Sequence, residues 1–450
     1  MKKFLFVSAN RYANPYPVYP LGISYLKAFL QERLPDYTFS TFDFNTGPEE
    51  SFRARLEEFR PDYIGLSLRN VDDVNFYSRE SFISGYRGIA EIVRSCTNAP
   101  LIVGGSAFSI FPREMFELLD PDWAIHGEGE ESLLNLLQSL DRGSPDLTTE
   151  GLVYRRGEEI VVNGRTNFLK RPDLEFDTGI IDFYWDKAGM VNIQTKRGCP
   201  YRCIYCTYPL IEGHQVRTLD PGRIVFTLKH LHERHGIDYV FFTDSVFNIS
   251  NTFNAELAEM MIDARLPVKW GAYFSPHKLT LDQLTLYARA GLTHIEFGTE
   301  SMSDTTLAHY GKHFRVDEVV RVSDDCNRAG IYFCHFMIIG GYGETEATVN
   351  ESFENSKRIA NTVFFPFVGM RIYPGTVLHE VALREGLVTP GDRLLEPVYY
   401  VAGGIDYDSL KSRADQTGRR WVFPDEDVAT VMNRMRKRNR KGSLWHHLKK

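Results

Sequence analysis

The chain has 450 residues, which is too long for one ordinary hydrophobic core, so we expect two or three domains. Its 43% hydrophobic and 25% charged residues exclude a largely disordered chain, and a net charge of −7 argues against nucleic acid as a partner. No apolar run approaches the roughly 20 residues of a membrane-spanning helix or forms a signal-peptide core, so we expect a cytoplasmic protein.

Residues 1–142 alternate short apolar runs with helical patterns, which predicts a doubly wound, Rossmann-like α/β domain. The predicted strands are KFLFVSA, TFSTFDF, YIGLSL and PLIVGG, and PLGISYLKAFLQERL predicts a helix that begins after Pro20. In such folds ligands lie beyond the carboxyl ends of the strands. We therefore expect a binding site in the segments that follow the strands, SANRYANPYP, LRNVDD, GGSAFSIFP and HGEGEES.

Residues 143–188 lose this periodicity and predict a linker that contains a hairpin in GLVYRRGEEIVVNG. Residues 189–385 return to alternating patterns and predict a partial (β/α)6 barrel, whose chemistry lies at the C-terminal ends of its strands. The six strands are predicted at Met190–Thr195, Tyr239–Thr243, Val268–Tyr273, His294–Gly298, Ile331–Ile339 and Phe364–Ile372.

Residues 386–450 show only weak periodicity and are expected to form a C-terminal extension. The last seventeen residues, 434–450, contain eight Lys or Arg residues and no acidic residue. Such a basic end is typical of a solvated, frayed helix. The alternative is contact with an anionic membrane surface, into which Leu444 and Trp445 would insert.

Three of the six cysteines, Cys199, Cys203 and Cys206, lie within eight positions directly after the first predicted barrel strand. Two kinds of metal centre use such a cluster of thiolates. A structural zinc ion needs a fourth protein ligand, for which His214 is a candidate. A four-iron cluster held by three thiolates leaves one iron open for another ligand, and the CxxxCxxC spacing favours this centre.

This spacing at this point of a β/α barrel resembles the radical S-adenosylmethionine (SAM) superfamily. The resemblance implies a [4Fe-4S] cluster on the three cysteines, with the open iron bound to the amino and carboxylate groups of SAM. It implies that an electron from the cluster splits SAM into methionine and a 5′-deoxyadenosyl radical, and that a flavodoxin or ferredoxin reduces the cluster. The segments TDSVFN, FGTES and IIGGYGET resemble the SAM-contacting segments of the family.

Four residues, one in the cysteine motif and three in these segments, are implied SAM contacts. Tyr205 matches the aromatic residue that packs on adenine, Glu300 is a polar contact, and Gly340 and Gly341 let the backbone approach the ligand. The alternatives are ordinary loop packing for Tyr205 and a buried ion pair for Glu300. Thr345, which follows the glycines, is a candidate helix cap.

An α/β domain that precedes such a barrel resembles the B12-binding subgroup of the superfamily, and this resemblance extends to about residue 385. GGSAFSIFP and HGEGEES match the subgroup's pattern, and their glycines would admit the nucleotide tail of cobalamin. SLRNVDD and GGSAFSIFP also resemble the ladderane-type branch, which serves lipid biosynthesis. The implied cobalamin-binding residues are Arg69, Gly104, Gly105, Ser106, Gly127, Glu128 and Gly129.

The best-known cobalamin domains place a cobalt-ligating histidine in a DxHxxG loop after the first strand. Here that loop reads SANRYANPYP, and the only histidine in the first 150 residues is His126, which we expect to be structural. The resemblance therefore implies base-off cobalamin without a histidine ligand. The guanidinium of Arg69 has no lone pair to offer and would exclude a lower ligand of cobalt, which favours cob(I)alamin. The alternative is an ion pair of Arg69 with Asp72 or Asp73.

The resemblance implies a cobalamin-dependent radical SAM methyltransferase. It would act on an unactivated carbon or phosphorus centre of a small-molecule or lipid-precursor substrate, through methylcobalamin and a 5′-deoxyadenosyl radical. The alternative is ring closure or skeletal rearrangement without net methylation. We assign no catalytic residue and no individual substrate from the sequence.

Two further functions fit the sequence less well. A tRNA methylthiotransferase carries three additional cysteines before the barrel, where this chain has only Cys96. A non-catalytic scaffold that keeps a cluster for stability would not require an open coordination site, nor the GTES and GGYGET segments.

Overall fold

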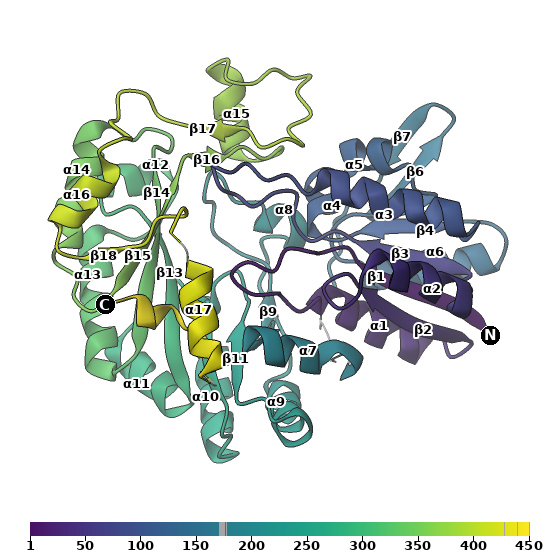
Figure 1. The fold of residues 1–450 in the computed structure, drawn as a ribbon, viewed down its shortest axis with the longest axis horizontal. Helices are drawn as coiled ribbons and strands as arrows, with labels where there is room; N and C mark the ends of the chain where they lie inside the picture. Colours follow the sequence, from purple (N-terminus) through teal and green to yellow (C-terminus); the bar gives the residue numbers. More distant parts are fainter. Residues whose placement is uncertain (171–175, 177, 427, 439, 450) are drawn as a thin grey trace.

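Two seven-stranded sheets, one in each half of the chain, organise the computed structural model (Figure 1). The structure describes residues 1–170, 176, 178–426, 428–438 and 440–449. None of the helices in these ranges combines the length and the apolar character that a bilayer crossing needs.

The first sheet has the strand order β2-β1-β3-β4-β5-β6-β7. Its first five strands are parallel, as the sequence predicts for a doubly wound domain, and β6 and β7 are antiparallel additions. The strands are β1 (Lys2–Ser8), β2 (Tyr37–Asp43), β3 (Tyr63–Ser67), β4 (Leu101–Gly104), β5 (Trp123–Ile125), β6 (Leu152–Arg156) and β7 (Glu159–Val162).

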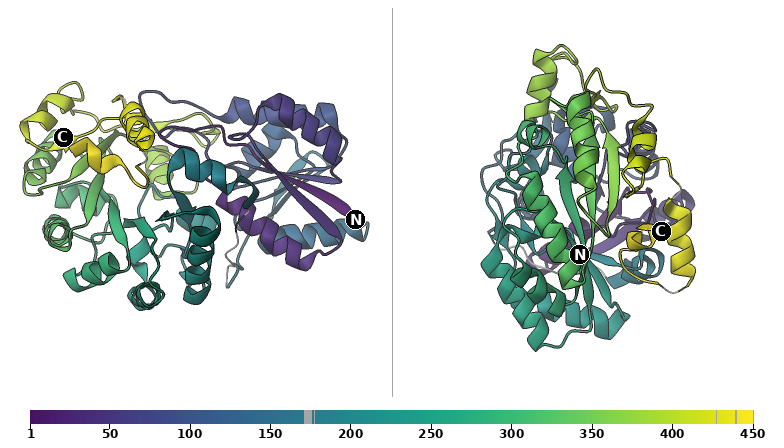
Figure 2. Two further views of the ribbon diagram at one scale, coloured as in Figure 1. Left: turned by 60° about the horizontal axis from the view of Figure 1, so that its bottom comes forward. Right: turned by 90° about the vertical axis from the view of Figure 1, so that its left-hand side faces the viewer.

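Helices cover both faces of this sheet because successive strand residues point to opposite sides (Figure 2, left). Phe4 and Phe6 of β1 pack with α1 and α6, whereas Leu5 and Val7 pack on the other face with α2, α3 and α5. The helices are α1 (Leu21–Arg33), α2 (Glu49–Phe59), α3 (Ile83–Cys96), α4 (Ser106–Ile110), α5 (Pro112–Leu119) and α6 (Glu130–Asp141).

The hairpin β6–β7 forms where the sequence predicts it, around Arg156 and Gly157. Its strand β6 pairs with β5, so the first sheet continues beyond residue 142, where we expected the first domain to end. Apolar residues of the hairpin account for this: Val153 and Ile160 are buried in the core that α2, α3 and α5 share with the sheet.

The second sheet has the order β18-β15-β14-β13-β12-β11-β8 and is parallel throughout. The six predicted barrel strands are all present, and β18 is a seventh that the sequence analysis missed because its two residues are too few for a periodic pattern. The strands are β8 (Val191–Ile193), β11 (Tyr239–Phe242), β12 (Lys269–Phe274), β13 (Leu292–Glu300), β14 (Tyr332–Ile339), β15 (Val363–Val368) and β18 (Arg420–Trp421).

Helices with clear capping signals lie on the outer side of this sheet (Figure 2, right). The Asp220 side chain caps α9, which ends at Gly236 in the left-handed conformation, and Thr345 caps α14 as expected. The helices are α9 (Pro221–His235), α10 (Asn251–Asp263), α11 (Leu281–Arg289), α12 (Asp304–His309), α13 (Val316–Ala329), α14 (Glu346–Ser356) and α16 (Leu410–Gln416).

Shorter elements connect the two halves and close the top of the second sheet (Figure 1). The strands β9 and β10 pair with each other, as do β16 and β17. These elements are α7 (Thr178–Ala188), β9 (Lys196–Arg197), α8 (Tyr208–Glu212), β10 (Arg217–Thr218), η1 (Phe247–Ile249), β16 (Met370–Arg371), α15 (Val377–Arg384) and β17 (Tyr399–Tyr400).

The C-terminal segment packs its apolar residues against the second sheet and is not frayed, whereas its basic residues Arg434, Lys437, Arg438 and Arg440 are exposed as expected. It forms α17 (Val428–Lys437) and η2 (Trp445–Lys449), which lie across the inner side of the sheet (Figure 1). Leu444 and Trp445 are 3% and 4% exposed, in a cluster with strand residues of β14 and β15. Since both side chains are buried in the protein, neither is available for insertion into a membrane.

Candidate active site between the two sheets

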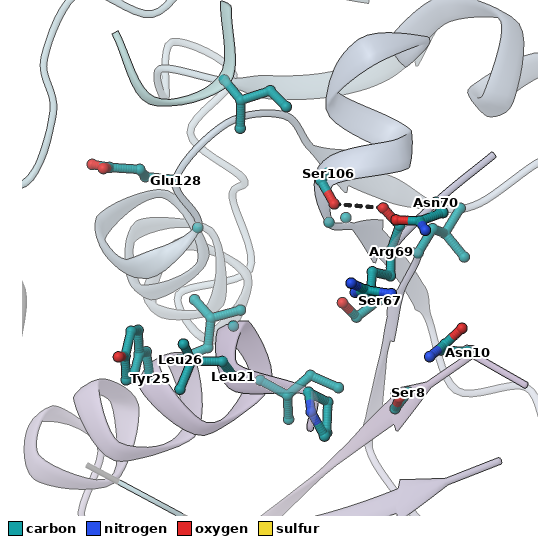
Figure 3. A pocket seen from close by; sticks show the side chains of 18 of the residues that line it. Ser8, Asn10, Leu21, Tyr25, Leu26, Ser67, Arg69, Asn70, Ser106 and Glu128 are labelled. Atoms are coloured by element: carbon teal, nitrogen blue, oxygen red, sulfur yellow. Dashed lines mark hydrogen bonds between the residues drawn. The ribbon is translucent and has the colours of Figure 1, made fainter. Parts of the chain in front are cut away.

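A cavity of about 550 Å³ lies between the carboxyl ends of the strands of the first sheet and the second sheet. One wall comes from residues that follow β1, β3, β4 and β5, and the opposite wall from β8, β12 and α8. Figure 3 shows α1 along one side, with Leu21, Tyr25 and Leu26, and Ser8 and Ser67 at the strand ends on the other. The cavity thus lies where the sequence analysis expected a binding site, beyond the carboxyl ends of the parallel strands (the strand-end rule).

All seven predicted cobalamin-binding residues line this cavity, although they come from three separate loops. The sequence analysis did not single out Ser8, Asn10 and Ser67, which also line it; Ser8 and Asn10 belong to the predicted loop SANRYANPYP. The seven are Arg69, Gly104, Gly105, Ser106, Gly127, Glu128 and Gly129.

Gly105 is required by the protein's own backbone. Its φ is +98°, and a Cβ at this position would lie 2.4 Å from the carbonyl oxygen of Leu68. A Cβ on Gly104 would lie 3.3 Å from the carbonyl oxygen of Ile125. The tight passage of β4 beside its neighbours thus accounts for Gly105 before any ligand is considered.

The side chain of Arg69 faces the cavity without an ion pair or hydrogen-bond partner among the described residues (Figure 3). The alternative pairing with Asp72 or Asp73 is wrong: Oδ2 of Asp72 is 2.8 Å from Nε of Arg371, and Asp73 accepts from Ser78. Ser106 Oγ donates to the backbone carbonyl of Arg69 at 2.6 Å and fixes the start of this loop.

Across the cavity from Arg69 lie Tyr208 of α8 and Tyr273 of β12. Burial raises the pKa of both hydroxyls, and the nearby guanidinium of Arg69 opposes that rise. Both tyrosines are therefore neutral hydrogen-bonding groups on the barrel side of the cavity.

The carboxylate of Glu128 points away from the centre of the cavity (Figure 3) and is occupied by protein partners. Arg217 donates to its Oε1 at 2.6 Å, Arg197 lies 3.4 Å from the same atom, and Leu169 N–H donates to Oε2. Arg197 also pairs with Glu130 at 2.7 Å. These buried ion pairs join the two halves of the chain, so the side chain of Glu128 has a structural task at the edge of the cavity.

The three clustered cysteines follow β9 in a tight loop that begins at Gly198. A Cβ on Gly198 would lie 2.1 Å from the carbonyl oxygen of Gln215, so the turn requires glycine. Cys199 is buried, and Cys203 and Cys206 are half-buried. Thr207 and Tyr208, directly after the last cysteine, line the cavity.

The environment of these thiols suits ligands of a metal cluster. Burial raises the pKa of Cys199 and raises that of Cys206 to about 12, and the nearby thiol of Cys203 adds to the rise in both pKa values. Hydrogen bonds from Ser245 and the backbone of Tyr201 to Cys199 oppose the rise. Three buried or half-buried thiols, with N–H and O–H donors beside Cys199, fit thiolates whose charge a bound cationic centre would compensate.

The zinc alternative is not supported. His214, its candidate fourth ligand, is exposed. No group of three or more His, Cys, Asp or Glu side chains within the described ranges is close enough to hold a single metal ion. A four-iron cluster places its own atoms between the thiolates and therefore needs them further apart.

Glu300 connects the cysteine loop to the end of β13. The Tyr205 hydroxyl donates to Oε1 of Glu300 at 2.8 Å, and Lys312 Nζ lies 3.3 Å from the same oxygen. Glu300 has a φ of +66° at a bulge after Gly298, an arrangement that re-aims a side chain at the edge of a sheet. The ion-pair alternative for Glu300 is thus present, and the SAM contacts of Tyr205 and Glu300 remain predictions.

Gly340 and Gly341 are required by neighbouring aromatic side chains. A Cβ on Gly340 would lie 2.2 Å from the Tyr407 hydroxyl, and one on Gly341 would lie 2.3 Å from that of Tyr310. Glu344 accepts from the Gly340 N–H and from Tyr310. Close packing explains both glycines, and their approach to SAM remains a prediction.

The TDSVFN segment after β11 forms hydrogen bonds and an ion pair within the protein through Asp244. Asp244 is fully buried, accepts from the backbone of Thr195 and pairs with Lys196 at 2.7 Å. It therefore anchors the strand that leads into the cysteine loop.

Comparison with known families matches both halves of the chain. The radical SAM superfamily matches residues 193–355, and the B12 binding domain matches residues 13–137. The first range contains the three cysteines and Glu300, and the second contains Arg69 and the glycines of the cavity. The chain belongs to the B12-binding radical SAM enzymes.

The cofactors of this B12-binding radical SAM enzyme are a [4Fe-4S] cluster with SAM, and cobalamin. The residues present fit both groups. Cys199, Cys203 and Cys206 form the donor set for the cluster, and the glycine-walled cavity lies at the strand ends of the first sheet, where a domain of this type binds its ligand.

Curated relatives of this B12-binding radical SAM enzyme are distant. The anaerobic magnesium-protoporphyrin IX monomethyl ester cyclase of Cereibacter sphaeroides is 27% identical over 74% of this chain and 55% of its own length. The tryptophan 2-C-methyltransferase of Streptomyces laurentii is 22% identical over 80% of this chain and 71% of its own length. The chain thus spans little more than half of the cyclase.

Solved structures share the fold over 93% to 100% of this chain. The radical SAM methyltransferase TsrM from Kitasatospora setae, solved with tryptophan and a SAM analogue, has a TM-score of 0.88. It is 19% identical and is covered over 97% of its length, with 100% of this chain aligned. The cobalamin-dependent radical enzyme OxsB has a TM-score of 0.74, 17% identity and 66% coverage of its own chain.

Proposed function

We propose that this protein is a cobalamin-dependent radical SAM methyltransferase that acts on an unactivated carbon or phosphorus centre of a small molecule. One observation carries the proposal: a single cavity is walled by the cobalamin-binding loops and by the two residues that directly follow Cys206. Methyltransferases among its relatives and structural neighbours support the proposal.

When bound, cobalamin supplies the methyl-carrying chemistry, and the cluster with SAM supplies the radical chemistry. The chain's own contribution begins with Arg69, a cation with no partner in the described part of the chain, which cannot ligate a metal. We propose that it keeps the lower face of a base-off cobalamin free of protein ligands. His126, the nearest sequence candidate for a ligand, instead hydrogen-bonds the carbonyl of Asn163 at 2.7 Å.

On the barrel side, Tyr205 and Lys312 fix the carboxylate of Glu300 next to the cysteine loop. We propose that this carboxylate contacts SAM and that the ring of Tyr205 packs on adenine. Backbone N–H groups of Gly340 and Gly341 already bond Glu344 and Tyr310, so this loop is held rigid before any ligand binds.

Partner proposals follow from the same chemistry. Since a cluster must be reduced before SAM is cleaved, we propose a flavodoxin or ferredoxin as electron donor. We also propose lipid precursors, as in the ladderane-type branch, as one class of small-molecule substrate.

Anaerobic incubation with SAM, cobalamin, a strong reductant and candidate acceptors tests the proposal. Formation of both 5′-deoxyadenosine and S-adenosylhomocysteine, with an acceptor product heavier by one methyl group, is the expected result. 5′-Deoxyadenosine alone, with an acceptor of unchanged carbon count, would instead support ring closure or rearrangement, which the resemblance to a cyclase keeps as the second candidate. If neither 5′-deoxyadenosine nor S-adenosylhomocysteine forms, both functions are contradicted.

A further inference from the structure

The inner side of the second sheet is only partly covered by the rest of the protein. Tyr273 of β12 pairs with β13 within the sheet, yet it is 37% exposed and lines the cavity. Further along the same side, alternate residues of β14 and β15 are half-buried, whereas the residues between them are buried against the outer helices. These half-buried residues are Phe336, Ile338, Phe365 and Phe367.

Glu296 of β13 lies on this apolar inner side. It pairs in register with Tyr273 on one side and with Cys334 on the other. Its side chain meets Trp445 of the C-terminal segment, whose indole Nε1–H donates to Oε1 at 3.1 Å. Tyr16, from the loop after β1, is near enough for the Glu296 charge to add to the rise in its pKa that burial causes.

Glu296 differs from the other buried carboxylates in the described ranges by its lack of partners. Each of the other seven either pairs with Lys or Arg or accepts two hydrogen bonds from the protein. Glu296 is 6% exposed, has no cationic partner and accepts a single hydrogen bond. The better-partnered set is Asp43, Asp72, Glu128, Glu130, Asp244, Asp325 and Glu344.

A carboxylate with several free lone pairs in an apolar site is costly unless something else meets it. Burial raises the pKa of Glu296 to about 7, which reflects the missing counter-charge. Removal of water by a ligand would strengthen any charge-assisted hydrogen bond to this group. Aromatic faces beside a carboxylate also favour a cation, because the ring quadrupole attracts positive charge.

We propose that Glu296 is a substrate-binding residue that holds a protonated amino group, while the aromatic inner side of the sheet takes an apolar body attached to that amine. Tyr273 links this site to the cavity, since it lines the cavity and neighbours Glu296 across the strand pair. This inference rests on the proposed function, because a bound amine is a substrate only if the protein is the proposed methyltransferase. It specifies the substrate class as an amine with an apolar, ring-bearing body.

The test compares a charged probe with its neutral counterpart. Isothermal titration calorimetry at pH 7 on the protein loaded with its cluster and cobalamin would measure 2-phenylethylamine against 2-phenylethanol, and tryptamine against tryptophol. We expect each amine to bind about tenfold more tightly than its alcohol, the size of one charge-assisted hydrogen bond. In Glu296→Gln the two members of each pair should bind within about twofold of one another.

Two variants control for structural damage. Trp445→Phe removes the indole donor but keeps the carboxylate, so the amine preference should persist. Glu296→Asp should weaken the preference without abolishing it. Iron content and the visible spectrum of bound cobalamin show whether each variant is folded.

Equal binding of amines and alcohols to the unaltered protein would overturn the proposal. So would failure of both amines to bind, or an amine preference that survives in folded Glu296→Gln. None of these readouts requires turnover, so loss of the methyltransferase proposal and loss of this one are distinguishable.

Discussion

The hydroxyl of Tyr205 donates a hydrogen bond to Oε1 of Glu300 at 2.8 Å, and this contact joins the cysteine loop to the end of β13 across 95 positions of sequence. Lys312 completes the arrangement at 3.3 Å from the same oxygen. The contact positions the loop that carries the cluster ligands relative to the barrel strands. Its loss should therefore lower the stability of the protein and change the geometry of the site.

Tyr205→Phe keeps the ring but removes the donor to a half-buried carboxylate, and a hydrogen bond to a charged group contributes about 1.5–3 kcal/mol. We expect the melting temperature, followed by circular dichroism, to fall by a few degrees. Tyr77→Phe, on a 58% exposed tyrosine, is the matched control and should leave the melting temperature unchanged. An unchanged value for Tyr205→Phe would mean that Lys312 alone holds Glu300.

Cluster assembly should depend on each clustered cysteine. Replacing Cys199, Cys203 or Cys206 by alanine removes one of three thiolates, and we expect iron and sulfide, about four each per reconstituted chain, to fall close to zero. Cys96→Ala is the control, because this half-buried thiol lies near Arg53 in the first domain and far along the chain from the loop. Retention of full iron content after loss of Cys206 would refute its assignment as a ligand.

Arg69→His tests the unligated lower face of cobalamin. An imidazole at this position offers a lone pair where the guanidinium offers none. We expect the electron paramagnetic resonance spectrum of bound cob(II)alamin to gain nitrogen splitting from an axial ligand. Arg87→His, on an exposed ion pair with Glu91, should leave the spectrum unchanged. Identical spectra for Arg69→His and the parent protein would place the side chain elsewhere.

His335 should make stability depend on pH. It is fully buried between Thr299 and Ser323, with aromatic rings on both sides, and burial lowers its pKa to about 3. Below pH 6.5 the unfolded chain takes up a proton that the folded protein refuses until about pH 3. Stability is therefore fully present above pH 6.5 and falls by up to about 1.4 kcal/mol per pH unit as the pH drops.

Melting temperatures of the protein and of His335→Gln between pH 8 and pH 5 measure this contribution. The variant keeps an amide for the two hydroxyl partners but has no proton to gain, so its melting temperature should fall less steeply on acidification. His230→Gln, on an exposed histidine of α9, should follow the parent protein. Parallel curves for all three proteins would show that burial does not lower the pKa of His335 in the folded protein.

The local patterns of the chain determined the elements and the site's location. Alternating apolar runs fixed all six predicted barrel strands, since a strand needs only its own residues and their period to be recognised. The strand-end rule brought Arg69, the glycine loops and the segment after Cys206 to one cavity for the same reason: parallel strands end at the same edge.

Tertiary structure alone decided what each polar side chain does. Glu128 is a predicted cavity residue, yet its carboxylate pairs with Arg197 and Arg217, whereas Glu296, which no sequence pattern singles out, accepts a single indole hydrogen bond. The basic C-terminal segment reads as solvated, yet Trp445 is buried against β13. Partners far apart in sequence set these outcomes, because desolvation and charge pairing depend on distance in space rather than on local period.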